Sequence, residues 1–171
     1  MSDHDVIRQI EALAGRALAH RMEGDVCVEL ALTDEGLPAY GVFRHAPEAT
    51  KAQALELVSR LRMLRKLDLR QNWLRRLPDA MGSLHELRWL DAASNYLGEV
   101  PTWMYGMEQL EHLNLGVNDL QSVSPEIARL RKLKALYIHK NAITALPREI
   151  GELSDLGVLN LYLNRFPDFP P

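Results

Sequence analysis

The chain has 171 residues, of which 47% are hydrophobic and 25% charged, and its formal net charge is −3. This length and composition are typical of one ordinary folded domain with a sizeable core, and they exclude an extensively disordered chain. The slightly acidic balance argues against a protein that binds nucleic acid over its whole surface.

The N-terminal segment is charged throughout and has no continuous apolar stretch. We therefore expect no signal peptide, and since no run of about 18 apolar residues occurs, we expect no membrane-spanning helix and no membrane partner. Cys27 is the only cysteine, which excludes an intramolecular disulfide. A reducing, cytoplasmic location is the natural expectation for such a chain.

The first predicted element is an amphipathic helix over residues 5–21, "DVIRQIEALAGRALAHR". Val6, Ile10, Leu13 and Ala17 recur at helical spacing and share one face, with charged residues opposite. Such an apolar helix face either covers an exposed end of the core or docks onto another protein. We expect the covering role and keep docking as the alternative.

A strand is predicted next, within "CVELALTDEGL" at residues 27–37. It aligns with a later segment at an offset of 37 residues, so that Leu30 matches Leu67 and Glu35 falls where an asparagine stands later. Cys27 takes the place of a core leucine in this alignment. We therefore interpret its thiol as a core side chain and not as a nucleophile.

A second helix is predicted over residues 47–60, because Pro47 suits the start of a helix and Ala54, Leu57 and Val58 recur at helical spacing. This helix replaces the shorter return segment that later units have. Residues 1–60 thus form a region that lacks the regular period of residues 61–171. We find no linker between the two regions and expect one continuous domain.

A period of 23 residues organises the rest of the chain. Five asparagines recur at this spacing: Asn72, Asn95, Asn118, Asn141 and Asn164. Aligned on them, one column contains only leucine: Leu67, Leu90, Leu113, Leu136 and Leu159. Short alternating segments such as "LRKLDL" predict strands with one buried face, and identical strands in identical register predict a parallel sheet.

The asparagine column has a structural interpretation. Where a chain turns away from a strand, buried backbone groups lose their partners in the sheet and need others. An Asn amide offers two donors and an acceptor, so a column of amides can bond backbone on both sides. We therefore interpret the five asparagines as a structural ladder and not as ligands.

The segment "LKALYIHKNAITALPREIGEL", residues 133–153, resembles the leucine-rich repeat pattern LxxLxLxxNxLxxLPxxIGxL. The length of 23 residues is similar to the intracellular Ras-group type, and shorter repeats of secreted bacterial effectors match less well. The resemblance implies an α/β solenoid: a right-handed superhelix with a parallel sheet on its concave face and an α-helical N-terminal cap, used mostly for protein recognition. Three departures are Ala92 in a leucine column, Pro125 displaced by one position, and the ending "RFPDFPP".

A basic stretch, residues 61–76, contains six cations: Arg62, Arg65, Lys66, Arg70, Arg75 and Arg76. A single helix or an extended arm would align these side chains, whereas a solenoid distributes them around one turn. We therefore expect no nucleic-acid arm. A basic end near the N-terminal repeats could instead attract an acidic protein partner.

Variable strand positions point to a protein-binding strip, because solvent-facing residues there are released from core packing. We expect it to be centred on Trp89, His112 and Tyr137, aromatic residues of the types that dominate interface energetics. The full candidate set is Arg65, Lys66, Asp68, Arg70, Arg88, Trp89, Asp91, His112, Asn114, Tyr137, His139 and Tyr162. The alternative is that these aromatics only cover the sheet. Trp73 and Tyr96 could form a second patch at the adjoining edge.

Catalysis is not expected. Asp68 and Asp91 would lie on adjacent strands, but nearby arginines should neutralise them, which argues against a proton-sharing pair. His112 and His139 are out of register by four residues, too far apart to share a metal. We find no nucleotide-binding glycine loop, nucleophile elbow or zinc spacing, and expect no cofactor and no metal.

The sequence thus predicts a non-catalytic protein-interaction module. The alternative is the repeat, or targeting, portion of a larger multidomain enzyme or secreted bacterial effector, suggested by the ending at residues 166–171. Unless Phe166 and Phe169 close that end, the last strand and its core stay open, and edge-to-edge dimerisation becomes a third possibility. The partner, the source kingdom and the oligomeric state remain open.

Overall fold

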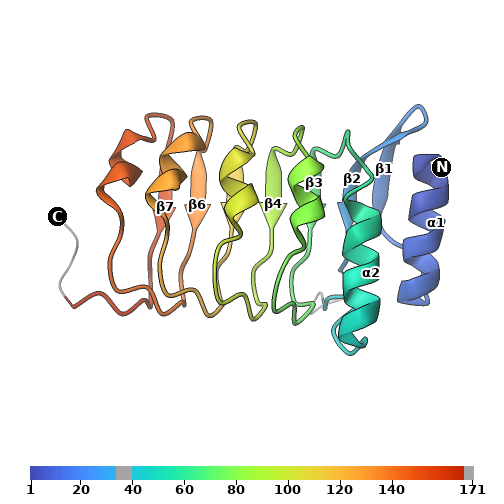
Figure 1. Cartoon of the computed structure of the whole chain (residues 1–171), viewed down its shortest axis with the longest axis horizontal. Helices are drawn as coiled ribbons and strands as arrows, with labels where there is room; N and C mark the ends of the chain where they lie inside the picture. Colours follow the sequence, from blue (N-terminus) through green and yellow to red (C-terminus); the bar gives the residue numbers. More distant parts are fainter. Residues whose placement is uncertain (34–39, 168–171) are drawn as a thin grey trace.

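The computed structural model describes residues 1–33 and 40–167. Figure 1 shows a single row of turns, with the helical segments lying over one face of the strands and α1 at the N-terminal end. The elements in chain order are α1 (Asp3–Ala14), β1 (His20–Glu23), β2 (Val26–Ala31), α2 (Glu48–Val58), β3 (Lys66–Asp68), η1 (Asp79–Ser83), β4 (Trp89–Asp91), η2 (Thr102–Gly106), β5 (His112–Asn114), η3 (Pro125–Arg129), β6 (Ala135–Tyr137), η4 (Arg148–Glu152) and β7 (Val158–Asn160). The η elements are 3-10 helices.

One seven-stranded sheet runs through these turns in the order β1 to β7. Strands β2 to β7 are parallel, which confirms the predicted parallel sheet, and the leucine column pairs in register from Leu67 opposite Leu90 onward. Leu30 lies opposite Leu67, so the predicted offset of 37 residues is confirmed. The predicted continuation of that strand through Glu35 lies outside the described residues.

The core lies between the sheet and the helical segments. Leu67, Leu90 and Leu113 are fully buried, because alternate strand residues point to the covered face and each leucine packs against its counterparts in neighbouring turns. The 3-10 helices lie in the return segments, which lead the chain from one strand back to the next. In η1, for example, Pro78 fixes φ directly before the first helical residue. In η3 the proline is displaced by one position, and Ser124 caps the segment by accepting a hydrogen bond from the backbone N–H of Glu126.

A left-handed residue and an asparagine turn the chain after each repeat strand. The residue before each asparagine has φ between 52° and 58°: Gln71, Ser94, Val117, Lys140 and Leu163. The amide that follows links two turns. In Asn118, for example, Nδ2 donates to the carbonyl oxygens of Leu115 in its own turn and Ala92 in the preceding one, while Oδ1 accepts from the N–H of Leu97.

Helix α1 is shorter than the sequence predicts. It begins at a capping box formed by Ser2 and Asp5, and it ends at Gly15, whose φ of 69° breaks the helix. Val6 and Ile10 are buried as expected, but Ala17 lies beyond the helix and is exposed, so its assignment to the helical face is wrong. The chain instead enters β1, which pairs antiparallel with β2 and was not predicted.

Helix α2 follows the prediction closely: it begins after Pro47 and buries Ala54 and Val58 completely. At the other end, β7 has no neighbour on its outer side within the described part of the chain. There Leu159 is 38% exposed and Leu163 55% exposed. Phe166 packs partly against the core, and Phe169 lies outside the described residues.

Candidate protein-binding surface

The sheet face opposite the helical segments, here called the open face, carries a ladder of stacked side chains. Because β3 to β6 pair in register, Lys66 and Trp89 are neighbours, and so are Trp89 and His112. The His112 ring stacks on Trp89 with centroids 5.2 Å apart and planes inclined by 14°, and Tyr137 continues the row at 5.2 Å. The Lys66 ammonium caps the row, 5.0 Å from the Trp89 ring centre.

This ladder, defined as Lys66, Trp89, His112 and Tyr137, combines contact with exposure. Lys66 is exposed and the three rings are half-buried. Burial between its neighbours lowers the pKa of His112 below the usual histidine value, which favours the neutral ring at pH 7. The ladder is therefore a mostly apolar, pre-formed strip with one cation at its N-terminal side.

One column of strand residues, at the same position in successive units, was expected to face solvent, but its first two members do not: the column consists of Asp68, Asp91, Asn114, Tyr137 and Asn160. Asp68 and Asp91 are only 6% and 5% exposed. Each carboxylate accepts a hydrogen bond from the backbone N–H two residues later, in Arg70 and Ala93, and Asn114 uses its side-chain oxygen in the same way. These side chains satisfy backbone donors at the strand end, which explains their burial.

Arg70 joins this column into one network. Its Nη2 lies 2.6 Å from Oδ2 of Asp68, its Nε lies 3.9 Å from Oδ2 of Asp91, and the hydrogen bond to Asp68 raises the pKa of Arg70 above its usual value. Asp91 also accepts from Nδ2 of Asn114. Burial raises the pKa of Asp91 above its ordinary range. Both oxygens of each carboxylate thus accept hydrogen bonds that hold the strand end and its neighbours in place.

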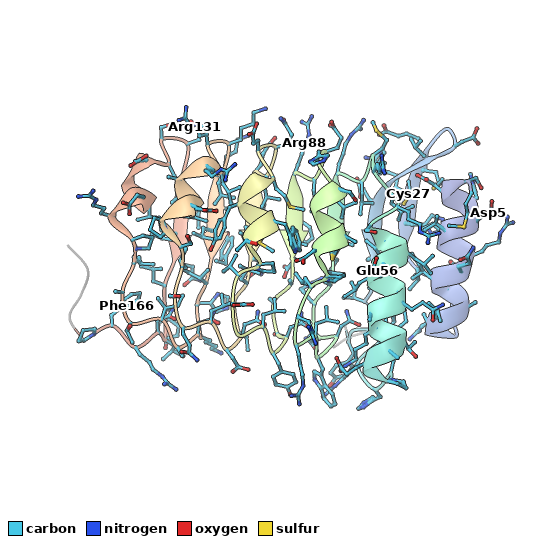
Figure 2. All side chains as sticks on the ribbon, in the orientation of Figure 1. Asp5, Cys27, Glu56, Arg88, Arg131 and Phe166 are labelled. Atoms are coloured by element: carbon cyan, nitrogen blue, oxygen red, sulfur yellow. The ribbon has the colours of Figure 1, made fainter. Side chains whose placement is uncertain are left out.

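Arg65 and Arg88 flank the ladder where the strands begin, and both are paired. Arg65 binds Glu23 at 2.8 Å, and Arg88 lies 3.8 Å from Glu111, which also binds Lys134 at 2.6 Å. Figure 2 shows Arg88 at the upper edge of the coil. The expected basic end is therefore partly neutralised, and Glu23 does so from the unpredicted strand β1.

His139 and Tyr162 lie apart from the ladder. The His139 ring packs directly over Gly116, where any added Cβ would overlap it, and its buried Nδ1 has no hydrogen-bond partner within the described chain. Tyr162 is 68% exposed near the C-terminal end of the sheet. The structure thus brings together one part of the candidate set and leaves these two outside it.

A second group gathers at the edge where the strands end. Trp73 and Tyr96 have ring centroids 6.3 Å apart, and His45 meets Trp73 edge-on at 4.8 Å. The guanidinium of Arg44 lies over Trp73 at 4.4 Å and over Tyr40 at 4.7 Å. Trp73 and Tyr96 were expected at this edge from their spacing. The other three residues come from the non-repetitive loop after β2 and had no period by which to place them.

The described residues contain no group of three or more histidine, cysteine, aspartate or glutamate side chains arranged to hold a metal ion. Within the same part of the chain, none of the helices has the length and apolar character needed to cross a membrane.

No family model matches the chain, and no curated protein matches it. Solved structures do. An internalin from Listeria monocytogenes str. 4b F2365 is 25% identical with a TM-score of 0.59, over 66% of this chain and 33% of its own. A leucine-rich repeat protein of Leptospira interrogans is 33% identical with a TM-score of 0.55, over 67% of this chain and 35% of its own.

The plant peptide hormone receptor RGFR1, in complex with RGF2, is 28% identical with a TM-score of 0.56, over 64% of this chain and 18% of the receptor chain. This chain therefore spans about a third or less of each neighbour's length. All three neighbours are proteins with leucine-rich repeats, which supports the predicted family at that level and confirms an α/β solenoid of the leucine-rich repeat kind.

Proposed function

Because the chain shares the leucine-rich repeat fold, we propose that it is a non-catalytic protein–protein interaction module, with the ladder on the open face as its recognition surface. The observation that carries the proposal is the stacked row of Trp89, His112 and Tyr137. It is assembled before any partner arrives, so little ordering entropy is lost on binding. The neighbour RGFR1, a plant peptide hormone receptor solved in complex with RGF2, supports a protein or peptide partner in general.

The finer features of this proposal follow the sequence. We propose 23-residue repeats of the intracellular type in a right-handed superhelix, with the open face on its concave side and a cytoplasmic role as a scaffold. Residues 1–60 would act as a helical cap with a degenerate first repeat, continuous with five repeats over residues 61–171. The burial of Val6, Ile7 and Ile10, which are side chains of α1, supports the capping role.

A pull-down from a lysate of the source organism tests whether the open face binds a partner. We expect the partner retained by the wild-type protein to be lost from the double variant Trp89→Ala/Tyr137→Ala. The matched control is Arg129→Ala, which removes an exposed side chain from η3 on the covered face. Equal retention by both variants, with unchanged thermal unfolding, would rule out the ladder as the recognition surface.

A self-association role has a separate observation in its favour. The outer edge of β7 is unpaired within the described chain, and Leu159 and Leu163 beside it are strongly exposed. Such an edge can pair with a second copy of the chain. Light scattering over a concentration series would show a dimer that Leu163→Lys dissociates. A monomer at all concentrations would exclude the dimer and leave the ladder proposal untouched.

The alternative is that this chain is the repeat portion of a larger protein. The chain covers 33%, 35% and 18% of the lengths of its three solved neighbours. In that case the repeats would target a catalytic part that lies elsewhere. The open reading frame around this sequence distinguishes the two possibilities directly.

A further inference from the structure

A second surface, separate from the ladder, lies at the edge where the strands end. It consists of Tyr40, Arg44, His45, Trp73 and Tyr96, here called the edge cluster. We propose that the edge cluster binds an acidic segment of a protein partner, with Arg44 receiving a carboxylate. The inference does not depend on the ladder, because the two groups share no residue.

Arg44 is the first reason. Its guanidinium carbon lies 4.7 Å from the Tyr40 ring centre and 4.4 Å from the Trp73 ring centre, and both ring faces attract a cation at such distances. Across the described residues no carboxylate lies within ion-pair distance of it, and its buried Nε has no hydrogen-bond acceptor. By contrast, Arg65 and Arg70 both pair with carboxylates. A buried donor without a partner is costly, and the other N–H groups of the same guanidinium are donors of the kind that bond most strongly to a carboxylate.

The remainder of the cluster leaves room for a partner. Arg44 as a whole is only half-buried, so the parts of its side chain other than Nε reach solvent. Tyr40 is 44% exposed and Tyr96 48% exposed, among the most exposed large apolar side chains of the described chain. Aromatic rings around an arginine are the composition that dominates binding energy at protein interfaces.

The backbone of Trp73 is the second reason. Its φ is 56°, a left-handed value that is rare for a bulky residue, whereas among the described residues its counterparts in the four following units have no such φ. The conformation is held from two sides. The buried Lys51 donates to the Trp73 carbonyl at 3.2 Å, and Oδ1 of Asn95 accepts from the N–H groups of both Asn72 and Leu74. Strain kept in place by its surroundings is concentrated at functional sites.

The loop that supplies Arg44 is fitted to the first repeat. The N–H of Phe43 donates to Oδ1 of Asn72 at 2.8 Å, and the N–H of Val42 donates to the Leu32 carbonyl at 3.0 Å. Gly41 permits this approach, because any Cβ there would collide with the Asn72 side chain. The cluster is therefore built around this one repeat.

Charge selects the partner. Arg75 and Arg76 follow Trp73 in the chain, are exposed, and have no ion pair within the described residues. They line a groove between α2 and the first return segment, together with Lys51, Glu48 and Asp79. Lys51 and Glu48 pair with each other at 2.9 Å, so that Asp79 is the carboxylate left to offset the arginines in this lining. Together with Arg44, the two arginines form a local excess of cations on a chain of net charge −3. One arginine against aromatic rings, with two more arginines in the adjoining stretch of chain, fits a short acidic peptide better than the long phosphate track of a nucleic acid.

Fluorescence anisotropy with a short fluorescein-labelled peptide of alternating Glu and Leu tests the proposal. We expect the wild-type protein to bind it, and binding to weaken as salt is raised. Arg44→Gln and Trp73→Ala should each weaken binding by about tenfold or more, because each removes a central contact. The same peptide with Gln in place of Glu should not bind. Arg129→Gln, far from the cluster, should bind like the wild type.

Two further variants keep the test decisive. Arg44→Lys retains the charge but not the planar stack, so it should bind more weakly than the wild type even if Arg44→Gln unfolds. Trp89→Ala/Tyr137→Ala should bind the acidic peptide normally, which separates failure of the ladder from failure of the edge cluster.

Four outcomes would overturn the proposal: no binding by the folded wild type, equal binding by Arg44→Gln, equal binding of the Gln peptide, or tighter binding of single-stranded DNA of equal charge.

Discussion

The middle of the sheet and its C-terminal end differ in how their leucines are covered, although the sequence repeats with the same period through both. In the middle turns Leu113 is fully buried, between neighbours on both sides, whereas Leu159 in the same column is 38% exposed. At the N-terminal end, α1 and α2 provide the cover and Ile10 is fully buried. The difference teaches that a repeat residue acquires its environment from the adjacent turns and not from its own unit.

The largest expected effect compares these two leucines directly. Leu113→Ala should reduce the free energy of unfolding by about 2–5 kcal/mol, because it leaves a cavity enclosed on both sides. Leu159→Ala should cost about 1 kcal/mol or less, since water already reaches that side chain. Urea denaturation followed by circular dichroism measures both. Equal losses would mean that the end turn is covered as well as the middle ones.

Asparagine substitutions extend the comparison to hydrogen bonds. Asn118→Ala leaves the carbonyls of Ala92 and Leu115 and the N–H of Leu97 without their partner in the interior, and should cost about 2 kcal/mol. Asn164 is only half-buried, so water can replace its bonds and Asn164→Ala should cost less. Chemical denaturation of the two variants side by side decides this, and a larger loss for Asn164→Ala would contradict it.

Helix α1 covers the N-terminal end of the core, and its capping box can be removed without changing a core residue. Ser2→Ala removes the capping box of α1 and should cost about 1 kcal/mol. Cys27 reports the result, since its thiol is fully buried, its backbone N–H donates to Asp3, and burial raises its pKa to about 11. Alkylation of Cys27 should be slow in the wild type and faster in Ser2→Ala, with Ser2→Thr as the control that keeps the cap. Unchanged alkylation would show that α1 does not shield this end.

The smallest expected effect concerns the pKa of His112, the middle ring of the ladder. An NMR titration should give His112 a pKa below the ordinary 6.5, and Trp89→Ala should move it back upward by reducing the burial. Because the folded state disfavours the protonated ring, the unfolded chain binds more protons below pH 6.5. Stability from this residue is therefore present above pH 6.5 and lost as pH falls below it. A pKa at or above 6.5 would show that the ladder does not desolvate the ring.

The period was sufficient to predict the strands, their register and the leucine-rich repeat architecture. Alternation alone could not predict the environment of Asp68 and Asp91. It placed them outward, whereas the backbone N–H two residues later and the Arg70 side chain bury them. A signal was present: four of the five residues in this column are Asp or Asn, the types that bond to their own following backbone.

The non-repetitive region was harder to predict, for a different reason. Apolar residues at helical spacing continue past Gly15, so the pattern did not reveal that the helix ends there and a strand begins. Arg44 and His45 have no counterparts in other units, and only the three-dimensional path of their loop brings them to Trp73. Periodicity predicts what recurs, and the edge cluster does not recur.

The asparagine amides also determine how the molecule should respond to mechanical load. The side-chain amide of each asparagine donates to a carbonyl oxygen of the preceding turn, so each turn is bonded to the turn before it along the long axis. Traction along the long axis should detach turns singly, beginning at the β7 side, where the amide is least shielded. Each release would lengthen the chain by about 75 Å, the contour length of one 23-residue unit. The fold would then yield gradually as an extensible tether instead of rupturing in one step.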